Sequence, residues 1–186
     1  MKWEILQTRL MAVLLVFSAL VVTFLLMQSV ELKSLQEQEL RAELAILLEQ
    51  SKGVIDAMEV LVHGGAMEEL IDLQVQVSRM VGILSKHHTD RLVNYGILVN
   101  PYSSIEAFLI LTLLDYPADA SVVRTSAVKV ASLKLHLVEL NIHLERVYGP
   151  FVTGQSKSQD IDTSTLHDLT QLIVMINGRV ARTIYE

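Results

Sequence analysis

Residues 10–27 read LMAVLLVFSALVVTFLLM, a run of apolar and small polar residues that contains no charge. As an α-helix this run would rise about 27 Å, close to the thickness of the hydrocarbon core of a bilayer. Backbone groups in lipid must pair with one another, so a run that spans a membrane must be helical. The stretch therefore predicts a transmembrane helix, to which we assign residues 10–29.

Two other interpretations of the same run are a cleaved signal peptide and a buried helix of a soluble domain. Lys2 and Arg9 would supply the positive region of a signal peptide, but the apolar run is longer than usual and residues 24–28, FLLMQ, offer no small-x-small cleavage site. A soluble core helix would normally carry some polar residues over such a length. We expect an uncleaved signal-anchor.

The distribution of basic residues predicts the orientation of this anchor. Lys2, Arg9 and the amino terminus precede it, whereas Lys33 and Arg41 follow it among several glutamates. Basic residues tend to stay in the cytoplasm and acidic residues count little, so the asymmetry is modest. We expect residues 1–9 to be cytoplasmic and residues 30–186 to form an extracytoplasmic domain of a single-pass cell-membrane protein.

Composition limits the classes of function. The 186 residues are enough for one domain and an anchor, and they are 51% hydrophobic but only 5% aromatic, which is typical of packed or lipid-facing helices. The formal net charge of −6 and the lack of a basic stripe argue against nucleic-acid binding. The chain has no cysteine, which excludes disulfides, thiolate metal sites and thiol nucleophiles.

Apolar spacing after the anchor predicts an all-α bundle of about five helices. The anchor should continue without a linker into a helix that ends at Gly64–Gly65, where glycine can take a left-handed conformation. The core stripe of this helix follows the 3-and-4 spacing of one helical face, in Leu40, Leu44, Leu47, Ser51, Val54, Met58 and Leu61. A second helix should cover residues 66–86.

Turn and cap signals predict the remaining three helices. Asn100–Pro101 marks a turn, and Ser103 with Glu106 forms a capping box before a third helix that reaches residue 116 and is too short to cross a bilayer. The fourth helix should run from a cap at Asp119 or Ser121 to about residue 148, before Gly149–Pro150. Thr163 or Ser164 should open the last helix, whose regular seam is Leu166, Leu169, Ile173, Ile176, Val180 and Ile184.

The fourth helix carries two apolar faces. One holds Val130, Leu133, Leu137, Leu140, Leu144 and Val147; the other holds Val128, Ala131, Leu135, Val138 and Ile142. Two narrow polar stripes separate them, with Ser132, His136, Glu139 and His143 on one side and Lys134, Asn141 and Glu145 on the other. A helix with two apolar faces must be covered on both. Either it is central in its own domain, or Val128, Leu135, Val138 and Ile142 contact another subunit.

Motifs for catalysis or cofactor binding are not found in the sequence, which has no glycine-rich phosphate loop, GxSxG, HExxH or EF-hand loop. The best metal-like group is His136, Glu139 and His143, which share a helix face and could present two imidazoles and a carboxylate. A solvated polar stripe explains these three residues more simply. His87, His88 and Asp90 form an equally weak second group. We expect no cofactor and no catalytic activity.

Three functional hypotheses remain. The first is a non-catalytic scaffold or assembly subunit of a membrane complex, which binds other membrane-protein subunits or copies of itself. The second is a helical ligand-sensing module that works with a separate signalling partner; its layout resembles the outer modules of bacterial chemoreceptors and sensor kinases, although no motif supports this likeness. The third, an enzyme, is the weakest because no catalytic constellation can be named.

Overall fold

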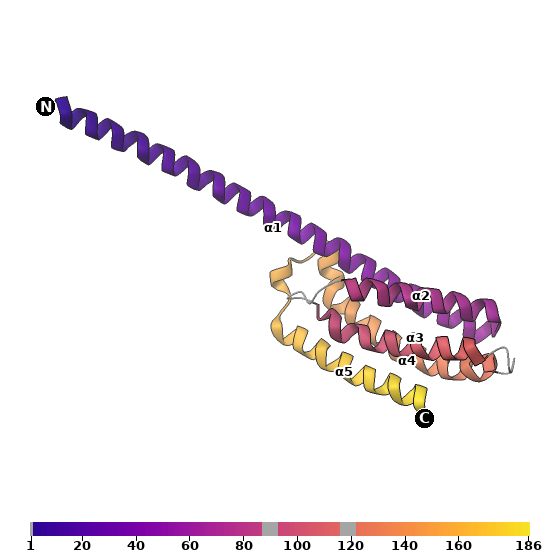
Figure 1. Cartoon of the computed structure of the whole chain (residues 1–186). Helices are drawn as coiled ribbons and strands as arrows, with labels where there is room; N and C mark the ends of the chain where they lie inside the picture. Colours follow the sequence, from indigo (N-terminus) through magenta and orange to yellow (C-terminus); the bar gives the residue numbers. More distant parts are fainter. Residues whose placement is uncertain (1, 87–92, 116–121) are drawn as a thin grey trace. The chain divides into compact units, whose positions relative to one another are not determined.

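The structure of the protein is a computed structural model that describes residues 2–86, 93–115 and 122–186, with side chains described within these ranges at residue 15 and from residue 17 onward. These residues contain no strand, so the predicted all-α class is confirmed for them. The α-helices, labelled in Figure 1, are α1 (Lys2–Gly64), α2 (Met67–Lys86), α3 (Tyr95–Asp115), α4 (Val122–Val152) and α5 (Thr163–Tyr185). A short 3-10 helix, η1 (Ser158–Asp160), lies between α4 and α5 in the sequence.

Helix α1 contributes to two separate units of the chain. The first unit, Met1–Leu40, consists of the outer part of α1. Its side chains between residues 17 and 30 are exposed, including Phe17, Leu20 and Phe24. This segment is long and apolar enough to cross a membrane, and by its position near the N-terminus it also qualifies as a signal sequence.

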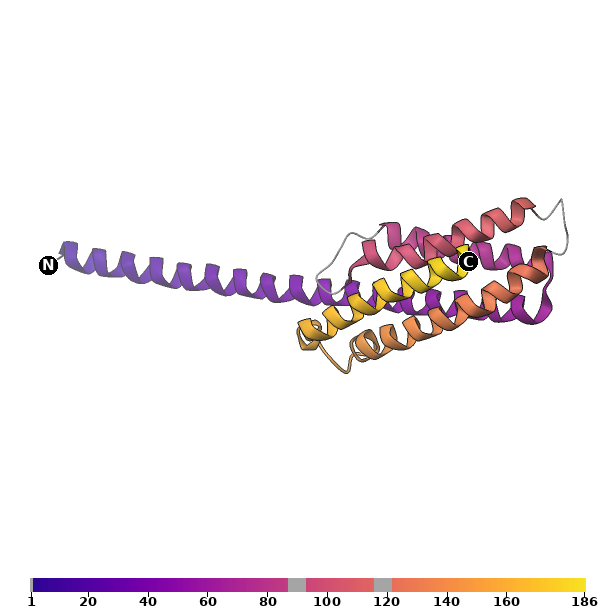
Figure 2. The same cartoon turned by 90° about the horizontal axis from the view of Figure 1, so that it is seen from below.

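The second unit, Arg41–Glu186, is a bundle made by the inner part of α1 with α2, α3, α4 and α5. Helix α2 packs along α3, and α5 packs along both α3 and α4 (Figure 2). The predicted core stripe of α1 is confirmed from Leu44 to Leu61, whose members are fully buried, whereas Leu40 at its start is only half-buried. The predicted seam of α5 is also buried from Leu169 to Ile184.

A left-handed glycine closes the α1 hairpin, as the sequence predicts. Gly65 has φ +67°, and its amide donates a hydrogen bond to the carbonyl of Leu61 at 2.9 Å. The amide of Ala66 then donates to Glu69 Oε2 at 2.8 Å, which satisfies one free donor at the start of α2. The chain therefore reverses within two residues, and α2 returns along α1.

The prediction for the third helix is wrong at its start. Helix α3 begins at Tyr95, where Asn94 Oδ1 accepts a hydrogen bond from the amide of Ile97 at 3.2 Å. Pro101 lies inside the helix, not in a turn. Buried apolar residues at helical spacing outweigh the local turn signal, and they are Tyr95, Leu98, Pro101, Tyr102, Ile105 and Leu109.

The predicted capping box of α3 has a different role. Ser103 lies within the helix, and Glu106 accepts a hydrogen bond from Ser78 Oγ of α2 at 2.6 Å. With 21 residues, α3 is long enough to cross a membrane, contrary to the prediction. One third of its most apolar segment is buried in the bundle.

The C-terminal end of α4 differs from prediction by a few residues, whereas the start of α5 agrees with it. Helix α4 continues through Gly149–Pro150 to Val152 because Phe151 is fully buried, and Gly154 with φ +78° follows it. Helix α5 begins at Thr163, as predicted, and Asp162 caps it by accepting a hydrogen bond from the amide of Ser164 at 3.3 Å. The predicted caps of α4, Asp119 and Ser121, lie outside the described residues.

Candidate interaction surface on the fourth helix

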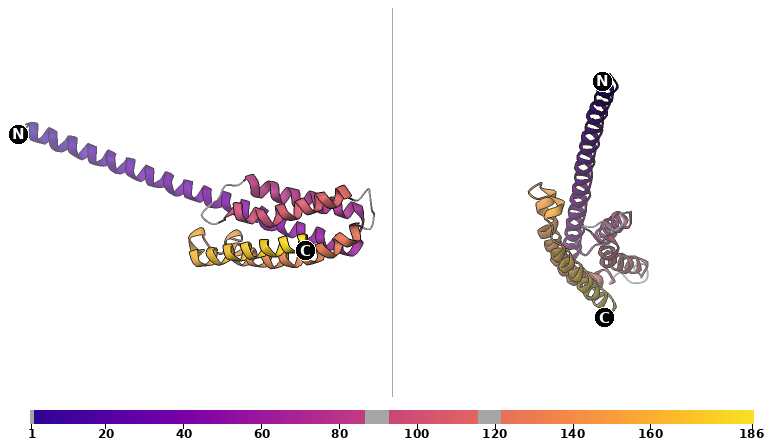
Figure 3. Two further views of the ribbon diagram at one scale, coloured as in Figure 1. Left: turned by 60° about the horizontal axis from the view of Figure 1, so that its bottom comes forward. Right: turned by 90° about the vertical axis from the view of Figure 1, so that its left-hand side faces the viewer.

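Helix α4 presents one apolar face to the core of the bundle. Leu133, Leu137, Leu140 and Leu144 are fully buried there, while Val147 is only partly covered. This face is the first of the two predicted from the sequence, and α4 packs against α5 and contacts α3 (Figure 3). Burying four leucine side chains contributes roughly 1.5–3 kcal/mol each relative to exposure, before entropy is counted. The rotation of α4 about its axis is therefore set by this face.

The second apolar face of α4 is open to solvent in the part of the chain that the structure describes. Val128 is 70% exposed, Leu135 66% and Ile142 50%, whereas Val138 is half-buried. The interpretation of α4 as a central helix, covered on both sides by its own domain, is therefore wrong for these residues. We call Val128, Ala131, Leu135, Val138 and Ile142 the outer stripe.

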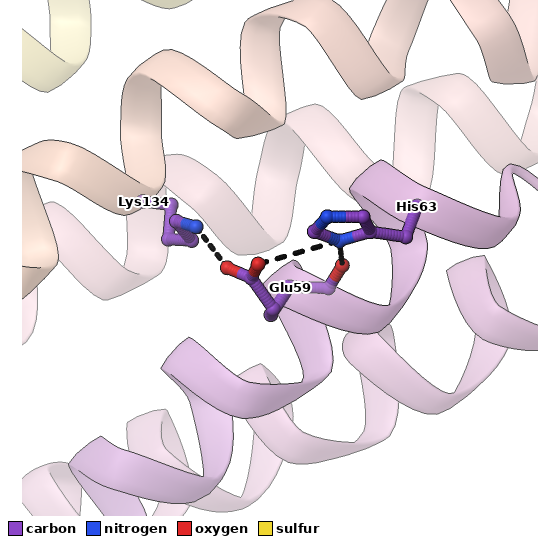
Figure 4. Close-up of polar contacts among 3 residues, drawn as sticks. All are labelled: Glu59, His63 and Lys134. Carbon is purple, nitrogen blue, oxygen red and sulfur yellow. Dashed lines mark hydrogen bonds and ion pairs between the residues drawn. The ribbon is translucent and has the colours of Figure 1, made fainter.

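One polar stripe of α4 binds α1. Lys134 donates a hydrogen bond to Glu59, and Glu59 also lies 3.3 Å from His63 Nδ1 (Figure 4). The hydrogen bond from Lys134 lowers the pKa of Glu59. Eleven residues along α4, Glu145 forms an ion pair of 2.8 Å with Lys52. These two contacts run in opposite directions along the two helices, so α4 is antiparallel to the inner part of α1.

The other polar stripe of α4 binds α5. Glu139 Oε2 accepts from Arg179 Nη1 at 2.7 Å, and His136 Nε2 lies 3.5 Å from Thr183 Oγ1. Burial lowers the pKa of His136, and the positive charge of Arg179 adds to this effect. Each polar stripe therefore faces a neighbouring helix, and the outer stripe lies between two lines of interhelical contacts.

The weak metal-binding group does not assemble in the described residues. Glu139 is held by Arg179, and no group of three histidine, aspartate or glutamate side chains among them is placed to bind a metal ion. His143 instead lines a groove between α4 and α5 with Arg146 and Asp168. The second candidate group, His87, His88 and Asp90, lies outside the described residues.

Two grooves adjoin the ends of the outer stripe. The first has a volume of about 510 Å³ and lies where α1 ends and α4 begins; Val128 and Arg124 line it. The second, of about 500 Å³, is the groove between α4 and α5 that contains Arg146 and Met175. Arg124 and Arg146 are both exposed on the same side of α4 as the outer stripe. The surface is thus an apolar strip with a guanidinium group near each end.

Comparison with protein-family models, with curated proteins and with solved structures finds no match to this chain. The function must therefore be inferred from the exposed surface of α4.

Proposed function

We propose that this protein is a non-catalytic, membrane-tethered assembly subunit that docks a protein partner on the outer stripe of α4. The observation that carries this proposal is the exposure of Val128, Leu135 and Ile142 along a single helical face. Isolated exposed apolar residues are normal on soluble proteins, but a contiguous strip rimmed by polar groups is typical of an interaction site. The charged residues on either side match the polar rim of such a site.

The anchor in this proposal is the apolar part of α1, with the N-terminus in the cytoplasm and the bundle outside. Its support is the length and apolar character of the exposed helix and the positions of Lys2 and Arg9 before it. Carbonate extraction of membranes tests this part: the full chain should stay in the membrane pellet. A product that begins near residue 30 and is released by the wash would contradict the anchor.

The docking surface is tested by photo-crosslinking of the full chain in its native membrane. A photoreactive phenylalanine analogue placed at Leu135 should give a crosslinked adduct. The matched control is Val174 of α5, an apolar residue with a similar exposure of 53% but outside the outer stripe. An adduct at Leu135 that is absent at Val174 supports docking on α4. No adduct at Leu135, or equal adducts at both positions, refutes it.

A further inference from the structure

The spacing of the outer stripe is that of a coiled-coil seam. Val128, Ala131, Leu135, Val138 and Ile142 follow one another at intervals of three, four, three and four residues. In heptad terms Val128, Leu135 and Ile142 occupy position a, and the other two occupy position d. Such a seam fits another helix with the same repeat. The outer stripe of a second copy has this repeat and is equally exposed.

The charges beside the stripe favour a parallel arrangement of two copies. Lys134 occupies position g and Glu139 position e of the following heptad, and these two positions meet across a parallel pair. In an antiparallel pair centred on Leu135, Lys134 would face Lys134 of the other copy. Arg124 and Arg146 meet an arginine in either arrangement, each other when antiparallel and their own copies when parallel, so they do not distinguish the two. The like-charge contact of Lys134 thus opposes the antiparallel arrangement, while its opposite-charge contact with Glu139 supports the parallel one.

The residues that bind Lys134 and Glu139 within each chain add to the charge complementarity between the two copies. Lys134 is already bound by Glu59, and Glu139 by Arg179. A parallel pair would therefore place four charges in a row, Glu59 and Lys134 of one copy followed by Glu139 and Arg179 of the other. The signs in this row alternate, so no charge loses its partner when the two surfaces meet.

The direction of the chain agrees with the same arrangement. The inner part of α1 is antiparallel to α4, as the pairs Glu59–Lys134 and Lys52–Glu145 show. In a parallel pair both chains therefore enter their bundles, at Arg41, at the same end of the dimer. Two anchors in one membrane need this arrangement, whereas an antiparallel pair would place the entries at opposite ends.

We propose that the outer stripe of α4 binds the outer stripe of a second copy of this chain in a parallel two-helix contact. This inference rests on the proposed function and names the partner of the same surface. The seam covers only about two heptads, so the interface is at the small end of the range for specific contacts. Tethering in one membrane raises the effective concentration of the two surfaces and favours the contact.

Cysteine crosslinking in membranes tests the pairing, because the natural chain has no cysteine. In the parallel pair, Val128→Cys faces itself and should form a disulfide-linked dimer, as should Ile142→Cys. In an antiparallel pair the two copies of either cysteine would be about 21 Å apart, beyond disulfide reach. Val174→Cys is the control for random collision, and it should give at least about fivefold less dimer than Val128→Cys.

A charge exchange tests the contact between Lys134 and Glu139. The double variant Glu59→Lys/Lys134→Glu keeps the ion pair within each chain but places two acidic groups opposite each other across the interface. In the Val128→Cys background it should lower the dimer yield by about fivefold or more. Adding Glu139→Lys and Arg179→Glu restores opposite charges across the interface and should restore the yield.

The possible results separate this inference from the proposed function. Disulfide formation only between Val128→Cys and Ile142→Cys chains, when the two are coexpressed, would overturn the parallel arrangement. No dimer from either cysteine, with a photo-crosslinked adduct to a different protein at Leu135, would overturn self-association and leave docking on α4 standing. No disulfide and no adduct would overturn both. An unchanged dimer yield in the double variant would remove the charge argument.

Discussion

Alanine at Leu137 should destabilise the bundle far more than alanine at Leu135, although the two leucines are only two residues apart on α4. Leu137 is fully buried, whereas Leu135 is 66% exposed. Removing a buried leucine side chain costs about 2–5 kcal/mol, from lost burial and from the cavity that remains. For a domain of this size that cost lowers Tm by about 5–15 °C. Leu135→Ala should change stability by no more than about 0.5 kcal/mol, or about 1–2 °C.

The assay for this pair is thermal unfolding of the full chain in dilute detergent. Near-ultraviolet circular dichroism is a suitable signal because Tyr95, Tyr102 and Tyr148 are buried in the bundle and lose their fixed surroundings when it unfolds. Comparing Leu137→Ala with Leu135→Ala tests which face of α4 is turned toward the core of the bundle. Equal shifts, or a larger shift for Leu135→Ala, would refute the assignment of the outer stripe and every proposal built on it.

Three further predictions concern the bundle. The hydroxyls of Ser51 and Tyr102 are fully buried and hydrogen-bonded to each other at 3.0 Å, so Tyr102→Phe or Ser51→Ala leaves one hydroxyl without its partner and should lower the free energy of unfolding by about 1–3 kcal/mol. In a double-mutant cycle, the loss in the double variant should be clearly smaller than the sum of the two single losses. Gly65→Ala should destabilise by about 1–2 kcal/mol because of its φ of +67°, while Gly82→Ala, in open space on α2, should stabilise by about 0.5–1 kcal/mol in the same melt. A hydrogen bond from its lysine partner is the main cause that lowers the pKa of Glu145 in the folded protein, so the stability it contributes is present above the unfolded pKa and is lost as the pH falls through the lowered folded pKa. Because the side chain is 40% exposed, Glu145→Gln should flatten the acid limb of stability against pH by only about 0.5 kcal/mol or less.

The buried faces of single helices could be predicted from the sequence because they depend on a local period. The stripe that includes Leu44 and Leu47 on α1, and the seam that includes Ile173 and Ile176 on α5, are both buried as their spacing predicts. The end of the helix at Gly65 could also be predicted, because few residues other than glycine adopt a left-handed conformation at the end of a helix. In each case the type of the residue and of its close neighbours in the sequence is enough to predict the local structure.

The start of α3 could not be predicted in the same way. Asn100–Pro101 is a turn signal, and Ser103 with Glu106 is a cap signal, so local rules place the helix start at residue 103. The structure instead buries Tyr95 and Tyr102 against the rest of the bundle, and Glu106 accepts a hydrogen bond from α2. Burial of two large aromatic side chains outweighs a cap that is worth about 1 kcal/mol. The helices that bury them lie elsewhere in the chain.

The polar stripes of α4 were visible in the sequence, but their partners were not. The alternation of His136 and Glu139 with apolar residues resembled a solvated face or a weak metal site. The structure shows that Glu139 is paired with Arg179, forty residues along the chain. A charge whose partner lies on a distant helix cannot be distinguished from an exposed charge until the helices are placed. This is why the sequence could not decide whether the second apolar face was covered.

The ion pairs beside the outer stripe depend strongly on the rotation of α4 about its axis, but they add little to the stability of the bundle. Exposed ion pairs such as Lys52–Glu145 and Glu139–Arg179 add little to the stability of the fold, in contrast to the burial of the leucines on the inner face. Their geometry, however, is specific to one rotation of α4. Turning the helix by one residue, about 100°, would separate both pairs and move Leu135 toward a flanking helix. The buried leucines set the rotation of α4, and the ion pairs on both sides fit only that rotation, in which the outer stripe is exposed.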